Sequence, residues 1–195
     1  MILFIAPKNT GLKEFKSLAD KYNNSKSKIV EVRGEDVPLF VSELVKQGKR
    51  AIGITGEDLF REFLLKNKDT PIKMLKRINW YNKEYIFGKP TLCLLGPKNK
   101  EFKSLPKRLK ICINSKYKEL AKKYCTNYLE NKGYRLEKIY ASGSTEELFS
   151  NNIVDMIIDV VCTGASAEKA GLEICGKLFP SDIVVLGGKN EKIQP

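Results

Sequence analysis

The stretch DMIIDVVCTGAS, at residues 155–166, combines the pattern of a buried strand with a small polar turn. Its first part is a run of β-branched and apolar residues, which is typical of a strand inside a sheet. The Thr-Gly-Ala-Ser turn that follows is typical of a helix start, where hydroxyl residues and glycine are common. A buried strand that leads through a short turn into a helix is the repeating unit of α/β proteins. We therefore expect an α/β fold.

The same turn has the chemistry of a phosphate cradle. Backbone N–H groups at a helix start have no intrahelical acceptor, and the helix dipole adds positive potential there. Gly164 lets a ligand approach the backbone, while Thr163 and Ser166 add hydroxyl donors. Asp155 and Asp159, on the strand, could accept hydrogen bonds from a ribose diol or hold a Mg²⁺-bound water. The alternative is structural: Ser166 caps a helix and Gly164 makes a turn.

Short apolar runs alternate with helical periods along the whole chain. The expected strands cover residues 1–6, 28–33, 51–55, 91–95, 109–113, 135–140, 153–161 and 182–186. The expected helices cover residues 12–23, 36–48, 56–66, 115–132, 144–150 and 165–178. This alternation predicts mostly parallel sheets. A polar, proline-containing break at about residues 88–107 predicts two α/β lobes, and a cleft between lobes is a common ligand site.

Composition excludes several kinds of site. The 195 residues include no histidine, which excludes a Ser-His-Asp triad, a Cys-His dyad and a histidine metal site. The five cysteines form no Cys-x-x-Cys pair, so we expect reduced and mostly buried thiols. The net charge of +12 favours polyanionic partners such as nucleotides, phosphosugars or nucleic acid, although dispersed lysines are most often solvated surface.

Targeting segments and nucleotide-binding signatures are not found. No apolar run approaches the roughly 18 residues that a membrane span needs. The apolar start, MILFIA, stops at Pro7 with no basic residues before it, so we expect a strand rather than a signal peptide, and a cytoplasmic protein. The chain has neither a P-loop nor a G-x-G-x-x-G pattern, which argues against a Walker-type NTPase and a Rossmann dehydrogenase.

Several blocks, in order, resemble the ATP phosphoribosyltransferase family, the first enzyme of histidine biosynthesis. Residues 154–172, VDMIIDVVCTGASAEKAGL, are similar to its A-D-x-I-x-D-x-V-x-T-G-x-T signature. Residues 32–62 look like its R-x-x-D-I-P and G-I-x-G-x-D blocks, and residues 114–146 like its S/T-x-Y block followed by G-S-V-E. Residues 86–97 are similar to its F-G-x-C-R-L, and residues 1–12 to its opening L-P-K-G-R-L. The resemblance covers nearly the whole chain.

The resemblance implies a two-lobed, periplasmic-binding-protein-like (type II) fold with a cleft between the lobes. Residues 1–88 plus 180–195 would form the first lobe, and residues 89–179 the second, with the phosphoribosyl-binding loop. The length resembles the short form of the family, which lacks a C-terminal regulatory domain. That form implies a homodimer or larger assembly and a separate regulatory subunit similar to a histidyl-tRNA synthetase core.

The resemblance also implies roles for individual residues. The residues implied to bind phosphoribosyl pyrophosphate are Asp155, Asp159, Cys162, Thr163, Gly164, Ala165, Ser166, Gly143, Ser144 and Glu146. The residues implied on the ATP side are Lys8, Arg33, Gly56, Glu57 and Asp58. Lys8, Asp155 and Asp159 would be catalytic, and no residue would ligate a metal directly. Two local alternatives stay open: Cys162 adds only bulk, and the acids at 57 and 58 only complement a helix dipole.

The implied reaction is attack by N1 of ATP on the anomeric carbon of phosphoribosyl pyrophosphate, with pyrophosphate leaving together with Mg²⁺. Its oxocarbenium-like transition state needs orientation and charge stabilisation rather than a protein nucleophile. One alternative is a catalytically diverged, phosphosugar- or nucleotide-binding regulatory protein of the same fold. Another is a nucleic-acid-binding protein driven by charge, but no aromatic-basic motif supports it.

The chain departs from the family pattern mainly on the ATP side. Residues 9–11 read Asn-Thr-Gly where Gly-Arg-Leu is expected, and residues 90–91 read Pro-Thr in place of Cys-Arg. Ser166 stands for threonine, which keeps the hydroxyl, and the usual Ala-Pro after Glu146 is absent. The phosphoribosyl side is therefore better preserved than the ATP side.

Overall fold

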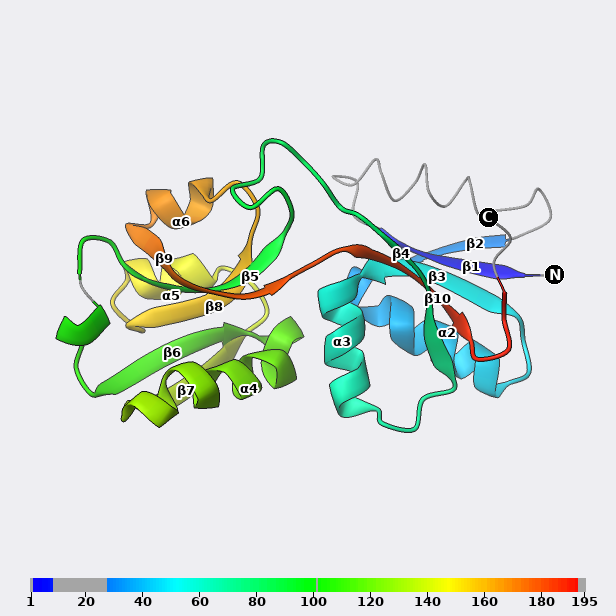
Figure 1. Ribbon diagram of the computed structural model, residues 1–195, viewed down its shortest axis with the longest axis horizontal. Coiled ribbons are helices and arrows are strands. Elements are labelled where there is room, and N and C mark those ends of the chain that lie inside the picture. The colour runs from blue at the N-terminus through cyan, green and yellow to red at the C-terminus, as the bar shows by residue number, and fades with distance from the viewer. Residues whose placement is uncertain (1, 9–27, 101, 193–195) are drawn as a thin grey trace. The chain divides into compact units, whose positions relative to one another are not determined.

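The computed structural model describes residues 2–8, 28–100 and 102–192. The predicted helix at residues 12–23 and the departure at residues 9–11 lie outside this part of the chain. Within it, the expected α/β fold with two separate sheets is confirmed (Figure 1).

The chain forms two compact units, and each is built around its own five-stranded sheet. The first unit comprises Met1–Asn79 with Asp182–Pro195, and the second comprises Trp80–Ser181. The chain therefore crosses between these units twice, and the resemblance implies lobes with the same order of segments but with boundaries at residues 88 and 179.

Local hydrogen bonds explain these boundaries. The backbone N–H of Ile86 donates to the carbonyl of Cys162, and that of Asn82 donates to the carbonyl of Gly88. The N–H of Ser181 donates to the carbonyl of Pro90. Residues 80–88 and 180–181 are thus tied into the second unit.

The first sheet has the strand order β2-β1-β3-β10-β4. Its strands are β1 (Leu3–Pro7), β2 (Lys28–Val32), β3 (Ala51–Gly56), β4 (Ile72–Ile78) and β10 (Ile183–Gly188). The first three pair in parallel, and β10 pairs antiparallel with both β3 and β4. Two helices complete the described part of this unit, α2 (Val37–Lys46) and α3 (Glu57–Lys66).

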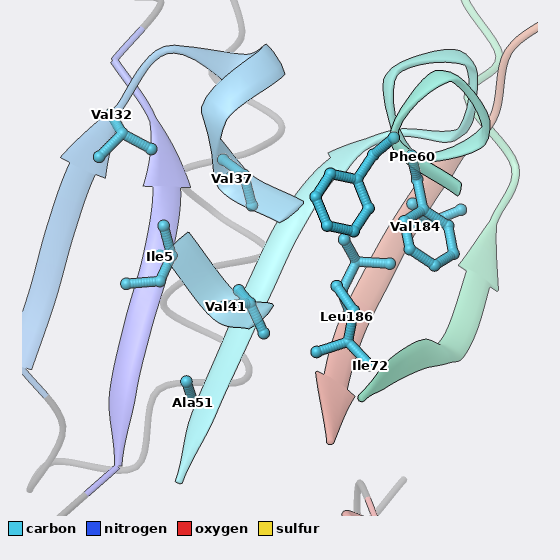
Figure 2. Packing of buried hydrophobic residues seen from close by; sticks show 10 residues of the cluster. Ile5, Val32, Val37, Val41, Ala51, Phe60, Ile72, Val184 and Leu186 are labelled. Carbon is cyan, nitrogen blue, oxygen red and sulfur yellow. The ribbon is translucent and has the colours of Figure 1, made fainter. Parts of the chain in front are cut away.

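The core of the first unit forms where these two helices pack on the sheet. Val37 and Val41 from α2 and Phe60 from α3 lie in one cluster with Ile5 and Leu186 from the sheet (Figure 2). All five are at most 2% exposed. Strands from distant parts of the chain are therefore held by one apolar layer, which fixes the sheet edge where β1, β2 and β3 end.

The second sheet has the strand order β7-β6-β8-β5-β9. Its strands are β5 (Thr91–Pro97), β6 (Arg108–Asn114), β7 (Arg135–Ala141), β8 (Met156–Val161) and β9 (Leu172–Pro180). Its helices are α4 (Lys118–Tyr128), α5 (Thr145–Ser150) and α6 (Ala165–Lys169). Strands β6, β7 and β8 pair in parallel, while β5 pairs antiparallel with β8 and β9. Helices α4 and α6 lie on opposite sides of this sheet (Figure 1).

Both sheets contain one reversed strand. Strand β10 in the first sheet and β5 in the second run against their neighbours, and the remaining pairings are parallel. Each reversed strand is the first one after the chain crosses into that unit. The prediction of mostly parallel sheets therefore holds except at these two points of entry.

The predicted helix at residues 165–178 is wrong. It is replaced by the short α6 and by β9, an edge strand. Gly171, with φ of 75°, lies between the two elements. From Leu172 onward the backbone pairs with β5, so sheet pairing overrides a pattern that also suits a helix. The predicted helix at residues 115–132 is a shorter helix, α4, flanked by 3₁₀ turns.

Candidate functional site

A small pocket lies at the carboxyl end of β8, in the second unit. Its volume is about 160 Å³. It is lined by Leu95, Glu146, Asp159, Val160, Val161, Cys162, Thr163, Gly164, Ser166 and Ala167. We call it the β8 pocket. The structure thus brings together six of the residues predicted for the phosphoribosyl side, from β8, the start of α6 and the start of α5.

The carboxylate of Asp159 is held by donors from three elements. Nδ2 of Asn114, the last residue of β6, lies 3.0 and 3.1 Å from the two carboxylate oxygens. Oγ1 of Thr145, the first residue of α5, lies 2.8 Å from Oδ2, and the backbone N–H of Val160 donates to Oδ1 over 2.7 Å. This network fixes the carboxylate without a cation.

The pKa of Asp159 is raised above its ordinary value. Burial is the main cause, because it disfavours the charged form, and the negative charge of Glu146 acts in the same direction. The hydrogen bonds from Thr145, Asn114 and the backbone of Val160 act the other way. The carboxylate therefore depends on these three donors to stay ionised.

Thr145 is shared between two carboxylates. Its Oγ1 lies 2.8 Å from Oδ2 of Asp159 and 3.2 Å from Oε2 of Glu146, and its side chain is fully buried. A hydroxyl has one proton, so it can donate to only one of two ionised carboxylates at a time. The shorter distance favours Asp159.

The turn after β8 is open to solvent and shaped by one glycine. Gly164 has φ of 78°, in the left-handed region that favours glycine, and a Cβ there would overlap Cδ1 of Ile86. Thr163 and Ser166 are exposed. The N–H of Ala165 lies 3.4 Å from Oγ1 of Thr163. Because α6 has only five residues, any anion at this turn would depend on local donors more than on a helix dipole.

Asp155 lies away from the β8 pocket. It precedes β8, whereas Asp159 lies toward the other end of that strand, about 13 Å further along at the usual rise per residue. Its Oδ2 accepts the backbone N–H of Lys110 over 2.7 Å, and its own N–H donates to the Lys110 carbonyl over 2.8 Å. The two acids therefore do not form a pair, and Asp155 ties β8 to the start of β6.

The predicted residues Gly143 and Ser144 precede α5 and are exposed. Ser144 has φ of 50°, and its carbonyl accepts the N–H of Glu147. Neither residue lines the β8 pocket. Gly143 and Ser144 can influence the pocket only by positioning Thr145 and Glu146, which follow them directly in the sequence.

The residues predicted on the ATP side lie at the carboxyl edge of the first sheet. Lys8 and Arg33 follow β1 and β2 and are exposed, and the N–H of Lys8 donates to the carbonyl of Val32. Gly56 ends β3 and is buried. Asp58, at the start of α3, is 5% exposed.

Glu57 is also 5% exposed, and its carboxylate is already bound by two arginines. Oε1 accepts from Arg77 Nη2 at 2.6 Å and from Arg61 Nη2 at 3.2 Å. These ion pairs link α3 to β4, and the site role of Glu57 stays a prediction.

Asn114 and Thr145 are the site residues that sequence analysis missed. One ends β6 and the other begins the helix after β7, so neither is near Asp159 in sequence. The usable signal was topological, because the carboxyl ends of parallel strands meet at one edge of a sheet and polar residues there converge.

The described residues were searched for membrane-spanning helices and for clusters of metal ligands. No helix among them has the length and apolar character of a membrane span. In the same ranges, no three Cys, Asp or Glu side chains gather as metal ligands would.

Comparison with known families gives a match over most of the chain. The family model described as "HisG: ATP phosphoribosyltransferase" matches residues 33–194. An ATP phosphoribosyltransferase of Sulfolobus acidocaldarius is 32% identical over 163 residues, which is 83% of this chain and 50% of the relative. One of Dictyoglomus thermophilum is 32% identical over 169 residues, 82% of this chain and 71% of the relative. The chain spans about half the length of the archaeal relatives it matches.

Solved structures support the fold. The ATP phosphoribosyl transferase (HisG:HisZ) complex from Thermotoga maritima matches with a TM-score of 0.70 and 22% identity, over 96% of this chain and 88% of that one. The periplasmic aliphatic sulphonate binding protein SsuA from Escherichia coli matches with a TM-score of 0.63 and 16% identity, over 96% and 65%. At these identities the likeness concerns the two-lobed, periplasmic-binding-protein-like fold.

Proposed function

The chain belongs to the ATP phosphoribosyltransferase family, and from that premise we propose that it joins N1 of ATP to the anomeric carbon of phosphoribosyl pyrophosphate. Pyrophosphate is released, and the reaction is the first step of histidine biosynthesis. The observation that carries the proposal is the β8 pocket. Its carboxylate, on β8, is held by hydrogen bonds, and the turn directly after β8 exposes hydroxyl groups.

The phosphoribosyl group binds in the β8 pocket in this proposal. Its 5-phosphate accepts hydrogen bonds from the hydroxyls of Thr163 and Ser166 and from backbone N–H groups of the turn. Its ribose hydroxyls reach Asp159. If the Thr145 hydroxyl turns to Glu146, 3.2 Å away, Oδ2 of Asp159 gains a free lone pair for a ribose hydroxyl.

The chemistry requires no protein nucleophile. A bond forms between N1 of the adenine and the anomeric carbon as the bond from that carbon to the pyrophosphate oxygen breaks, and pyrophosphate leaves with the electron pair. The transition state carries positive charge on the ribose, which a nearby carboxylate stabilises. Lys8 and Arg33, exposed at the edge of the first sheet, supply positive charge for the phosphates of ATP or pyrophosphate.

Magnesium enters this scheme with the substrate. The oxygens of Asp159 already accept hydrogen bonds from three protein donors, which compete with direct ligation of a metal. Mg²⁺ commonly binds through substrate phosphates with few protein ligands. We therefore propose that it is carried by pyrophosphate and neutralises the leaving group.

The proposed assembly is a homodimer or larger oligomer with a regulatory subunit similar to a histidyl-tRNA synthetase core. The Thermotoga structure, which is an ATP phosphoribosyl transferase (HisG:HisZ) complex, motivates this proposal. A cytoplasmic location is consistent with five free thiols, because disulfides are rare in that compartment.

A second candidate is a catalytically diverged protein that binds a phosphosugar or nucleotide and regulates another process. One observation favours it: at the positions where the family pattern has Cys-Arg, Pro90 and Thr91 are both buried and neither supplies a cation. Such a protein would bind phosphoribosyl pyrophosphate but release no pyrophosphate.

The deciding experiment is a calorimetric titration of phosphoribosyl pyrophosphate into the chain with Mg²⁺, followed by an assay of ATP-dependent pyrophosphate release. We expect saturable binding that weakens in both Ser166→Ala and Asp159→Asn. Turnover with ATP supports the transferase, and binding without turnover, with or without the regulatory subunit, supports the second candidate. Absence of binding by the folded chain together with its regulatory subunit contradicts both.

A further inference from the structure

A second concave surface lies on the other face of the same sheet. It has a volume of about 500 Å³, and its floor consists of Leu94 on β5 with Gly176 and Leu178 on β9. Tyr128 and Tyr134 form its aromatic walls, next to the end of α4. We call it the lysine-rimmed groove, because lysines are among the residues that line it.

Three lysines, Lys103, Lys107 and Lys132, line this groove, and all three are exposed. None of them forms an ion pair with another described residue. Nζ of Lys107 lies 4.4 Å from the ring centroid of Tyr134. Among the residues that the structure describes, none that lines the groove carries a carboxylate, and the three lysines place positive charge around an apolar floor.

The groove is separate from the β8 pocket. Leu94 lines the groove and Leu95 lines the pocket, and neighbouring residues of a strand point to opposite faces of the sheet. Both surfaces lie within the second unit.

We propose that the lysine-rimmed groove binds a small organic anion, with an apolar, flat body on the leucine floor and its carboxylate, sulfonate or phosphate on the lysines. A volume of about 500 Å³ lies within the range of small-molecule sites. Cationic and aromatic groups around an apolar floor match an amphiphilic anion in both shape and charge. This proposal does not depend on the transferase reaction.

Charge argues against a second copy of the chain as the occupant. The protein carries a net charge of +12, and a symmetric contact through this groove would place the lysines of one copy against those of the other. An anion is attracted by the same field.

A suitable probe is 8-anilinonaphthalene-1-sulfonate, whose fluorescence rises in an apolar site. The comparison probe is N-phenyl-1-naphthylamine, which has the same rings and no sulfonate. We expect one saturable site for the anion, and binding of the neutral probe that is weaker by roughly threefold to fivefold per lost ion pair.

The variant that tests the location is Gly176→Val. A Cβ at this position would meet only Cβ of Leu94, at 3.9 Å, so a side chain can occupy the groove without displacing the backbone. Valine also suits a strand. Circular dichroism and the thermal midpoint verify that the variant is folded, and we expect it to abolish saturable binding.

The variant that tests the charge is Lys107→Gln with Lys132→Gln, and its matched control is Lys122→Gln with Lys123→Gln. The control removes the same charge from exposed positions of α4 that do not line the groove. Only the groove variant is expected to weaken the binding of the anion, and neither variant should change that of the neutral probe.

A chemical readout locates the probe independently. Cys175 lines the groove and is exposed, whereas Cys162 lies in the β8 pocket. Bound probe should slow alkylation of Cys175, followed by mass spectrometry, and leave that of Cys162 unchanged. Saturating phosphoribosyl pyrophosphate should not displace the probe.

Three results would overturn the proposal. The first is unchanged probe binding in Gly176→Val, and the second is displacement of the probe by phosphoribosyl pyrophosphate. The third is probe binding that weakens as protein concentration rises, which would indicate that a second copy occupies the groove.

Discussion

The hydroxyl of Thr145 lies 2.8 Å from Oδ2 of Asp159 and joins the start of α5 to β8. Both the shape of the β8 pocket and the ionisation of its central carboxylate depend on this contact. Replacing the hydroxyl with a methyl group therefore tests the site with almost no change of volume.

Thr145→Val should lower the free energy of unfolding by about 1–3 kcal/mol, because a buried carboxylate loses a donor. Phosphoribosyl pyrophosphate should also bind more weakly. Chemical denaturation and calorimetry measure the two effects. Thr145→Ser keeps the hydroxyl and is the matched control. Equal stability of the valine variant and the wild type would show that Asp159 does not need this donor.

The pH dependence of stability should report the raised pKa of Asp159. A carboxyl group whose pKa is higher in the folded than in the unfolded state stabilises the fold below its unfolded pKa, and that contribution is lost as pH rises through the folded pKa. The difference in unfolding free energy between Asp159→Asn and the wild type should therefore shift in favour of the variant as pH rises from below 3.8, the ordinary value of the group, through the folded pKa.

Carboxyl chemical shifts measured by NMR give a direct check. The titration midpoint of Asp159 should lie above 3.8. A midpoint at or below that value would mean that the hydrogen bonds outweigh burial.

Gly164→Ala should weaken phosphoribosyl pyrophosphate binding and destabilise the fold by about 1–2 kcal/mol, the cost of a left-handed alanine. The added Cβ overlaps Cδ1 of Ile86, the end of a half-exposed side chain, so either that side chain or the turn has to shift. Gly133→Ala is the matched control: its φ is 82° and no atom lies within 4 Å of the added Cβ. Combining Gly164→Ala with Ile86→Ala should restore part of the binding, and failure to do so would place the cause elsewhere.

Asp155→Asn should affect stability and leave substrate binding nearly unchanged. Its carboxylate accepts a backbone N–H at the far end of β8, and losing a charge-assisted hydrogen bond costs about 1–3 kcal/mol. Denaturation and calorimetry of Asp155→Asn beside Asp159→Asn separate the two acids. Comparable losses of binding in both variants would contradict the separation of their roles.

The local pattern predicted much of the fold, and nonlocal pairing accounts for the errors. The run at residues 153–161 was predicted as a strand because apolar and β-branched residues coincide there, and the structure forms β8 within it. Residues 172–178 also have apolar positions that suit a helix, and only the partner strand β5 decides between the two. A reversed strand such as β10 is buried like its parallel neighbours, so its direction cannot be predicted from its own sequence.

The site was predictable where it is contiguous in sequence. Thr163 and Gly164 form a local motif, and they lie in the same pocket as Asp159. The partners of Asp159 come from the ends of other elements, which only the tertiary structure brings together. Asp155 does not line the β8 pocket, because two residues on one face of a strand can lie at opposite ends of it, and its predicted site role stays a prediction.

The position of β10 in the first sheet has a consequence for how the chain folds while it is being synthesised. This strand inserts between β3 and β4, and its residues Val184 and Leu186 belong to the core. The second unit is a continuous segment, Trp80–Ser181, and can fold as soon as it has left the ribosome. The first unit, although translated earlier, has to wait with an open sheet until β10 emerges. We therefore expect the second unit to complete its fold before the first, in the reverse of the order of synthesis.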